Sequence, residues 1–386
     1  EVPDRIAAVD RASRLTWAEI DERTNRLANA LSARGVKKGD RVAFLLKNDH
    51  YWLEVTFATL KLGAVLVPLS YRMTTKELER VVQDCRPSAL VSADSFLALC
   101  QDLPLPSGET SNTILIGPPG QGMTGYEELL DQADPGALKT GVGEHDLACV
   151  SFTSGTTGFP KGVMWTHQTL LATVSDNPFP AELCRHSRQL VLAPTFLAGA
   201  LTQVLNGAYN TATLIVQDFD PAEVLGTIER ERPTLMACAA VMLRMLASLP
   251  DANGCDTSSL ERIYYGGAAI GSYEAYREIR KLFTCDLQQG YGSAETCILI
   301  TRLDPVDHKE LQTTERRERL RSAGRVAGGA RVKLVAPDGQ EVTEVGEVGE
   351  VAVKASWVMI GFWYRPLERA KVFDPVGYYL TGDMGS

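Results

Sequence analysis

The sequence predicts an α/β fold built on mostly parallel sheets, followed by a small β-rich unit. Apolar strands alternate with amphipathic helices up to residue 93, and the alternation returns between residues 189 and 283. Alternation at this spacing is typical of parallel sheets covered by helices. After Gly324 the helical pattern gives way to short strands and turn residues. We therefore expect α/β subdomains over 1–323 and a β-rich subdomain over 324–386.

The first helix is expected at 17–35, because Thr16 and Glu19 form a capping box before it and Gly35 can end it. The elements expected after it are a strand at 41–47, a helix at 51–62, a strand at 64–70, a helix at 75–85 and a strand at 89–93. Residues 103–143 are rich in Pro and Gly, which predicts a long connection.

An apolar strand is expected at 147–152. Beyond it we expect strands at 189–194, 212–217, 234–239 and 262–266, and helices at 221–232 and 272–283. In the last part, residues 330–342 are predicted to form a hairpin that turns at Asp338 and Gly339. A further strand is expected at 346–355.

Composition and charge exclude several classes of protein. The formal net charge is -9, which argues against a nucleic-acid partner. No apolar run reaches the roughly 18 residues of a membrane span, and no secretory signal is visible. The eight cysteines form no CxxC pair, and the five histidines show no metal-binding spacing. We therefore expect a cytoplasmic protein without disulfides or zinc.

The segment TSGTTGFPKG at 153–162 follows the expected strand directly. In an α/β sheet, ligands bind at the carboxyl ends of the strands. Hydroxyl groups and backbone N–H groups in such a loop can converge on an anion, and Lys161 adds a positive charge. The pattern indicates a phosphate site, although its spacing differs from that of a Walker loop.

The stretch SFTSGTTGFPKGVMWTH at 151–167 resembles the phosphate-loop signature of the adenylate-forming superfamily. This superfamily includes acyl-CoA and aryl-CoA synthetases, luciferase and the adenylation domains of peptide synthetases. Further family motifs resemble YYGGAAI at 264–270, QQGYGSAET at 288–296 and GYYLTGDMG at 377–385. The resemblance covers almost the whole chain and is nearest to acyl-CoA synthetases. It implies a large N-terminal domain with two α/β subdomains and a small distorted β-barrel.

The resemblance also implies roles for individual residues. ATP phosphates would be bound by Thr153, Ser154, Gly155, Thr156, Thr157, Gly158 and Lys161. Adenine and ribose would be bound by Gly267, Ala268, Ala269, Gly290, Tyr291, Gly292 and Asp383. Glu295 would bind Mg²⁺, and Lys161 and Glu295 would be the catalytic residues. The acyl pocket would contain Phe196, Leu197, Gly199, Tyr264 and Gly266.

Two positions depart from the family pattern. Ala294 stands where a threonine usually precedes the glutamate, which removes a hydroxyl near the phosphates. Leu197 stands where many acyl-CoA and aryl-CoA synthetases have a histidine. No aspartate in 193–200 could pair with a substrate ammonium, so we expect an apolar aromatic or aliphatic acid and not an α-amino acid.

The resemblance implies an acid–thiol ligase. A carboxylic acid and ATP would give an acyl-adenylate and pyrophosphate, and the acyl group would then pass to coenzyme A. Transfer to the phosphopantetheine of a carrier protein is an alternative, and so is a degenerate nucleotide-binding module without activity. The family's C-terminal lid, which carries a further lysine, is expected after the last residue, Ser386, and so to be absent from these 386 residues.

Overall fold

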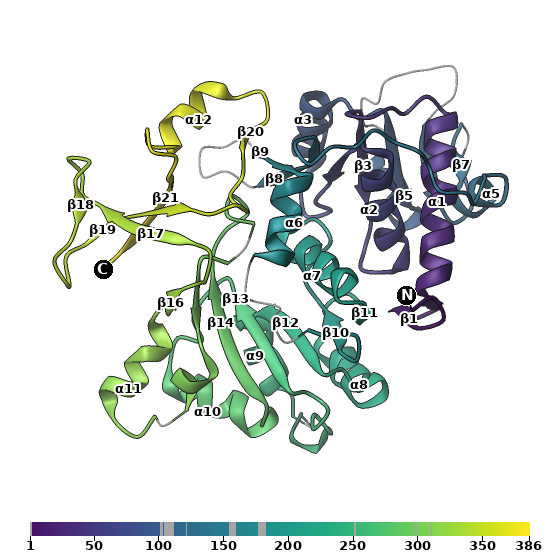
Figure 1. The fold of residues 1–386 in the computed structure, drawn as a ribbon. Helices are drawn as coiled ribbons and strands as arrows, with labels where there is room; N and C mark the ends of the chain where they lie inside the picture. The colour runs from purple at the N-terminus through teal and green to yellow at the C-terminus, as the bar shows by residue number, and fades with distance from the viewer. Residues whose placement is uncertain are drawn as a thin grey trace.

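The computed structural model describes residues 2–100, 103, 112–120, 122–153, 160–176, 183–250, 252–297, 299–309 and 311–386. Two large sheets and a small one form the fold over these residues (Figure 1). The first large sheet has the order β20 (Gly361–Phe362), β9 (Lys161–Thr166), β8 (Leu147–Thr153), β4 (Val65–Pro68), β3 (Arg41–Leu45), β5 (Ala89–Ala93), β6 (Thr113–Ile116), β7 (Thr124–Gly125). Its strands from β8 to β7 are parallel, as predicted.

The second large sheet combines the N-terminus with the middle of the chain. Its order is β16 (Arg325–Val326), β15 (Thr301–Leu303), β14 (Asp286–Tyr291), β13 (Arg262–Gly266), β12 (Leu235–Ala239), β10 (Arg188–Val191), β11 (Thr213–Val216), β1 (Ile6–Val9), β2 (Arg14–Thr16). The strands from β14 to β1 are parallel, so their carboxyl ends meet at one edge of the sheet.

The helices cover both large sheets. They are α1 (Trp17–Ala33), α2 (His50–Leu62), α3 (Thr75–Cys85), α4 (Leu97–Cys100), α5 (Tyr126–Asp131), α6 (His167–Ser175), α7 (Ala198–Tyr209), α8 (Pro221–Glu231), α9 (Ala240–Ala247), α10 (Tyr273–Leu282), α11 (Thr314–Glu318) and α12 (Pro366–Val372). The predicted capping box is confirmed, since the Thr16 hydroxyl accepts from the Glu19 N–H and the Glu19 carboxylate accepts from the Thr16 N–H.

The two large sheets share one apolar core. Phe44 of β3 and Val216 of β11 belong to the same buried cluster, together with Trp52 of α2 and Leu201 of α7. Helix α2 is buried on nearly every side, which is expected of a helix that lies between layers. Figure 1 shows α6 and α7 between the strands of the two large sheets. A ligand site on α7 is therefore held between two rigid layers.

The small sheet has the order β18 (Glu341–Val342), β17 (Arg331–Val335), β19 (Gly349–Lys354) and β21 (Tyr379–Gly385), and it is antiparallel. The hairpin predicted at 330–342 is confirmed, with Gly339 at φ 85° in its turn. Strands β16 and β20 lie in the same stretch of sequence but pair with the large sheets. The β-rich segment is thereby joined to both.

The prediction that 103–143 is only a connection is wrong. Strand β6 lies in this segment and pairs in parallel with β5, and β7 and α5 follow it. The sequence of β6 is TILI, which is short and lies between Pro- and Gly-rich stretches. Its burial against the neighbouring strand decides its structure, and local composition does not show that burial.

Three expectations from composition concern the cysteines, membrane-spanning helices and clusters of metal ligands. Cys85, Cys100, Cys149, Cys238 and Cys297 are buried free thiols. In the described part of the chain, no helix combines the length and the apolar character that crossing a membrane requires. The same residues contain no cluster of three or more potential metal ligands from Cys, His, Asp and Glu.

A buried charge network ties α1, α2 and α5 together. The Glu54 carboxylate is fully buried and accepts hydrogen bonds from Arg23, at 2.6 and 3.1 Å. It also accepts one at 2.7 Å from the hydroxyl of Tyr126. Arg23 contacts Glu127 of α5 as well, so one guanidinium links all three helices. Removing Glu54 would leave Arg23 with Glu127 as its remaining partner and the buried Tyr126 hydroxyl without its acceptor.

Glu54→Ala should therefore lower the free energy of unfolding by roughly 3–5 kcal/mol, measured by chemical denaturation. Glu22→Ala is the matched control, because Glu22 pairs with Arg26 on the exposed face of α1. The control should cost less than about 1 kcal/mol. Equal losses in the two variants would contradict a structural role for the buried network.

Candidate active site

A cavity of about 350 Å³ lies between α7 and the second large sheet. Residues of the parallel strands β12 and β13 form its floor. Ala239 of β12 is paired with Gly266 of β13, which is paired with Gly290 of β14, and all three line the cavity. These residues lie at the carboxyl ends of their strands, where ligands bind in α/β sheets.

The expected adenine and ribose residues lie at this same edge. Gly267, Gly290 and Gly292 line the cavity. Gly267 has φ +75° and open space where a side chain would project, so its backbone is accessible to a flat ligand. Ala268 follows it and is exposed, and Ala269 is half-buried. Small residues here leave room for a nucleotide base.

Tyr291 and Asp383 are brought together although they are far apart in the sequence. The Tyr291 hydroxyl donates a 2.6 Å hydrogen bond to the Asp383 carboxylate, which joins β14 to β21. Burial and this hydrogen bond raise the pKa of Tyr291 to about 12, so the hydroxyl stays protonated. Asp383 is exposed and keeps acceptor sites for a further pair of donors.

Glu295 follows β14 in a turn at 294–297. Its backbone carbonyl accepts from the N–H of Met359, and its side chain is half-buried. The carboxylate has no ion pair or hydrogen bond with another described residue. A single half-buried carboxylate fits Mg²⁺, which binds through one or two carboxylates and completes its shell with phosphate oxygens and water.

Lys161 begins β9 and is opposite Thr153 of β8 in the antiparallel register. Its ammonium forms a 2.6 Å ion pair with Glu368 of α12 and lies 5.5 Å from the centre of the Phe362 ring. The hydrogen bond with Lys161 lowers the pKa of the Glu368 carboxyl. The lysine is therefore held on β9, beside the end of β8, the strand that precedes the predicted phosphate loop. The other predicted loop residues, Ser154, Gly155, Thr156, Thr157 and Gly158, lie outside the described residues.

Four of the five residues expected in the acyl pocket line the cavity, namely Leu197, Gly199, Tyr264 and Gly266. Phe196 lies elsewhere. Its ring packs edge-on against Tyr71, at 5.0 Å between centroids, and beside the guanidinium of Arg72.

Several polar lining residues were not expected from the sequence. Gln189, Gln203, Asn206 and Ser293 line the cavity, and each has a buried side-chain oxygen without a hydrogen-bond partner among the described residues. Two amides at i and i+3 in the apolar helix AGALTQVLNGAY are the signal in the sequence that could have indicated them. Ser293 directly precedes Ala294, so it offers a hydroxyl next to the position where the family threonine is missing.

The family profile described as AMP-binding enzyme matches residues 1–363. The chain belongs to the AMP-binding enzyme family. Its relatives include acyl-CoA and aryl-CoA ligases, so the resemblance seen in the motifs is confirmed.

Individual members of the AMP-binding enzyme family resemble the chain over nearly its full length. Feruloyl-CoA synthase from Amycolatopsis sp. is 34% identical over 386 residues, which cover 100% of this chain and 73% of that protein. Indoleacetate–CoA ligase from Aromatoleum aromaticum is 31% identical over 374 residues, 96% of this chain and 71% of that protein. The N-terminal domain of FACL13 from Mycobacterium tuberculosis superposes with a TM-score of 0.86 at 26% identity, covering 100% of this chain and 93% of that one.

Lys161→Ala should slow adenylate formation roughly 100-fold, the loss typical of removing one preorganised donor to a developing charge. It should lower the free energy of unfolding by less than about 1 kcal/mol, because its ion pair with Glu368 is partly exposed. Pyrophosphate release and chemical denaturation measure the two effects.

Glu368→Gln is the matched variant, because it removes the partner and keeps the lysine. We expect it to change the KM for ATP by no more than about fivefold. A loss of rate as large as that of Lys161→Ala would mean that the pair, and not the ammonium, is needed.

Proposed function

We propose that this chain activates an aromatic carboxylic acid with ATP and forms its coenzyme A thioester. The observation that carries the proposal is the single cavity that runs from the adenine-edge glycines to the expected acyl residues. A cavity of this form can hold the acid and the nucleotide with their reacting groups adjacent. The aromatic class is supported by the feruloyl and indoleacetate relatives, and the absence of charge among the described lining residues supports an acid with an uncharged acyl group.

In the first step, a carboxylate oxygen attacks the α-phosphorus of ATP. The bond between the α-phosphorus and the bridging oxygen breaks, and pyrophosphate leaves with the electron pair. Two anions must approach each other, so positive charge and oriented donors lower the barrier most. Lys161 would supply that charge together with the predicted phosphate-loop residues, Thr153 to Gly158. Asp383 and Tyr291 would orient the ribose and the adenine.

In the second step, the thiol of coenzyme A attacks the acyl carbonyl. The thiol loses its proton, the new C–S bond forms, and AMP leaves as the C–O bond breaks. The walls of the cavity exclude water from the mixed anhydride, which limits hydrolysis. The phosphopantetheine of a carrier protein has the same thiol, so a parallel assay with coenzyme A and a loaded carrier identifies the acceptor.

Glu295 would hold Mg²⁺, which neutralises phosphate charge when it is bound. Glu295→Gln should raise the Mg²⁺ concentration needed for half-maximal rate by roughly tenfold, since a neutral amide is a weaker ligand than a carboxylate. The measurement is a Mg²⁺ titration of pyrophosphate release. An unchanged titration would remove Glu295 from the metal site.

The test of the proposed function is acid-dependent ATP–pyrophosphate exchange by the full-length protein, over a panel of aromatic and aliphatic acids. Exchange with aromatic acids, followed by thioester formation on addition of coenzyme A, is the expected result. If none of the acids supports exchange while the folded protein still binds ATP, the proposal fails in favour of a nucleotide-binding module. Buried free thiols in the core support a reducing compartment such as the cytoplasm.

A further inference from the structure

The far end of the acyl cavity contains three side-chain amides. Gln189 lies on β10, and Gln203 and Asn206 lie one turn apart on α7. The three side chains are nine-tenths or more buried, with exposures of 5%, 9% and 6%. Among the described residues, none of their side-chain oxygens has a hydrogen-bond partner. An amide oxygen that is buried without a partner costs about 1–3 kcal/mol, so three in one cavity require an explanation.

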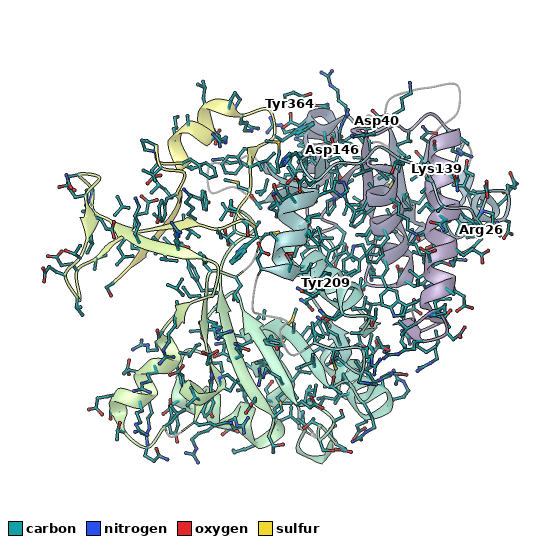
Figure 2. The ribbon with its side chains drawn as sticks, viewed as in Figure 1. Arg26, Asp40, Lys139, Asp146, Tyr209 and Tyr364 are labelled. Atoms are coloured by element: carbon teal, nitrogen blue, oxygen red, sulfur yellow. The ribbon has the colours of Figure 1, made fainter. Side chains whose placement is uncertain are left out.

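These amides are close to one another. Gln203 and Asn206 are at i and i+3, so they share a face of α7. A side-chain atom built on Gly207 would lie 3.4 Å from the Gln189 oxygen, which places this oxygen beside the turn of α7 that contains Asn206. Tyr209 marks the exposed last turn of the same helix in Figure 2. The amides therefore form one polar group at the junction of α7 and β10, which we call the amide end.

The amide end lies far from the nucleotide edge. Gln189 is paired with Leu235 at the start of β12, whereas Ala239 at the end of that strand borders the adenine-edge glycines. Leu235 and Ala239 are four residue steps apart along the strand, a distance of roughly 13 Å. Helix α7 runs back along the same path, from Leu197 at the nucleotide edge to Asn206 at the amide end.

Between its ends the cavity is lined by small, mostly apolar residues. The helix contributes Ala198 and Gly199, and the sheet contributes Ala237, Ala239 and Gly266. Small residues on both walls leave room for a ring between the helix and the sheet. The Thr202 hydroxyl also lies here, but it bonds to the Ala198 carbonyl of its own helix at 3.1 Å.

The hydrogen-bonding groups and the charge at the amide end determine which group of a substrate could bind there. The three buried atoms without partners among the described residues are acceptors, so a ligand group that donates a hydrogen bond would satisfy them. None of the described residues that line the cavity is charged, so nothing there would stabilise an ammonium. A neutral hydroxyl on an aromatic ring meets both requirements.

We infer that the substrate is a planar aromatic acid of about cinnamate length, with a hydroxyl group at the end remote from its carboxylate. The hydroxyl donates to the amide end while the carboxylate lies at the nucleotide edge. This inference rests on the proposed function, and it deepens it by naming the substrate class. Gln189, Gln203 and Asn206 are specificity-determining residues in this account.

The experiment compares 4-hydroxycinnamate with 4-methylcinnamate, which has a similar shape but no donor. In ATP–pyrophosphate exchange by the full-length protein, kcat/KM should be at least about tenfold higher for the hydroxylated acid. Gln203→Met and Asn206→Leu should each bring this ratio close to one. Tyr209→Phe is the control on the same helix, because Tyr209 does not line the cavity, and it should leave the ratio and the rate unchanged.

A binding measurement separates recognition from chemistry. Non-reactive acyl-sulfamoyl adenosines made from the two acids should raise the Tm, and the hydroxylated analogue should raise it more. Equal shifts from the two analogues, or a preference for the methyl acid, would overturn the inference while leaving the proposed function intact. A preference for 8-hydroxyoctanoate over 4-hydroxycinnamate would overturn the assignment of a planar ring.

The outcome for the variants is also decisive. A uniform loss of rate with every acid in Gln203→Met and Asn206→Leu would mean that the amides are structural, and it would sink the inference. If these variants do not fold, the wild-type comparison of the two acids still decides it. Failure of all acids to support exchange, with no Tm shift from either analogue, would instead refute the proposed function.

Discussion

The close packing of α7 against the second large sheet fixes the shape of the site. A Cβ atom at Gly207 would clash with the Leu214 side chain of β11, so any larger residue would push Leu214 or the helix away. The contact sets the separation between helix and sheet, and with it the width of the cavity. The small residues further along α7 then leave space where the helix would otherwise touch the strands. One glycine contact thus makes the far end of the cavity tight and leaves its middle open.

The site is assembled from segments that are distant in the sequence. Tyr291 ends β14 and Asp383 lies on β21, and their hydrogen bond connects the large sheet to the small one. Lys161 and Glu368 connect the first large sheet to the helix beside the small one. Each sheet therefore contributes at least one side chain to the proposed nucleotide site. The relative placement of the sheets is a condition for function as well as for stability.

Much of this arrangement could be predicted from the sequence, because many of its signals are local. The capping box at Thr16 and the turn at Gly339 depend on neighbours within a few residues, and both were found where expected. The motifs around Lys161 and Tyr291 identified the family because their residue types are required by phosphate and nucleotide binding. The order of these motifs along the chain indicated the family even though no contact between them was known.

What could not be predicted depends on contacts that are distant in the sequence. Strand β6 forms because β5 offers it a partner, and its own four residues give no clear signal. Phe196 follows β10 among cavity-lining residues, yet its ring packs against Tyr71, which belongs to the segment after β4. The amides of α7 can be recognised as part of a polar group only because Gln189 of β10 lies beside them in the structure. The spacing of these residues in the sequence does not show that β10 and α7 bring them together.

The ion pair between Lys161 and Glu368 has a consequence for the order of events on the enzyme. The ammonium already has an anionic partner in the absence of nucleotide, so in the proposed function the incoming phosphates would compete with a carboxylate of the protein itself. If the lysine turned toward the nucleotide, α12 would lose one of its attachments to β9. Occupation of the proposed phosphate site would thereby affect a helix more than 200 residues further along the chain.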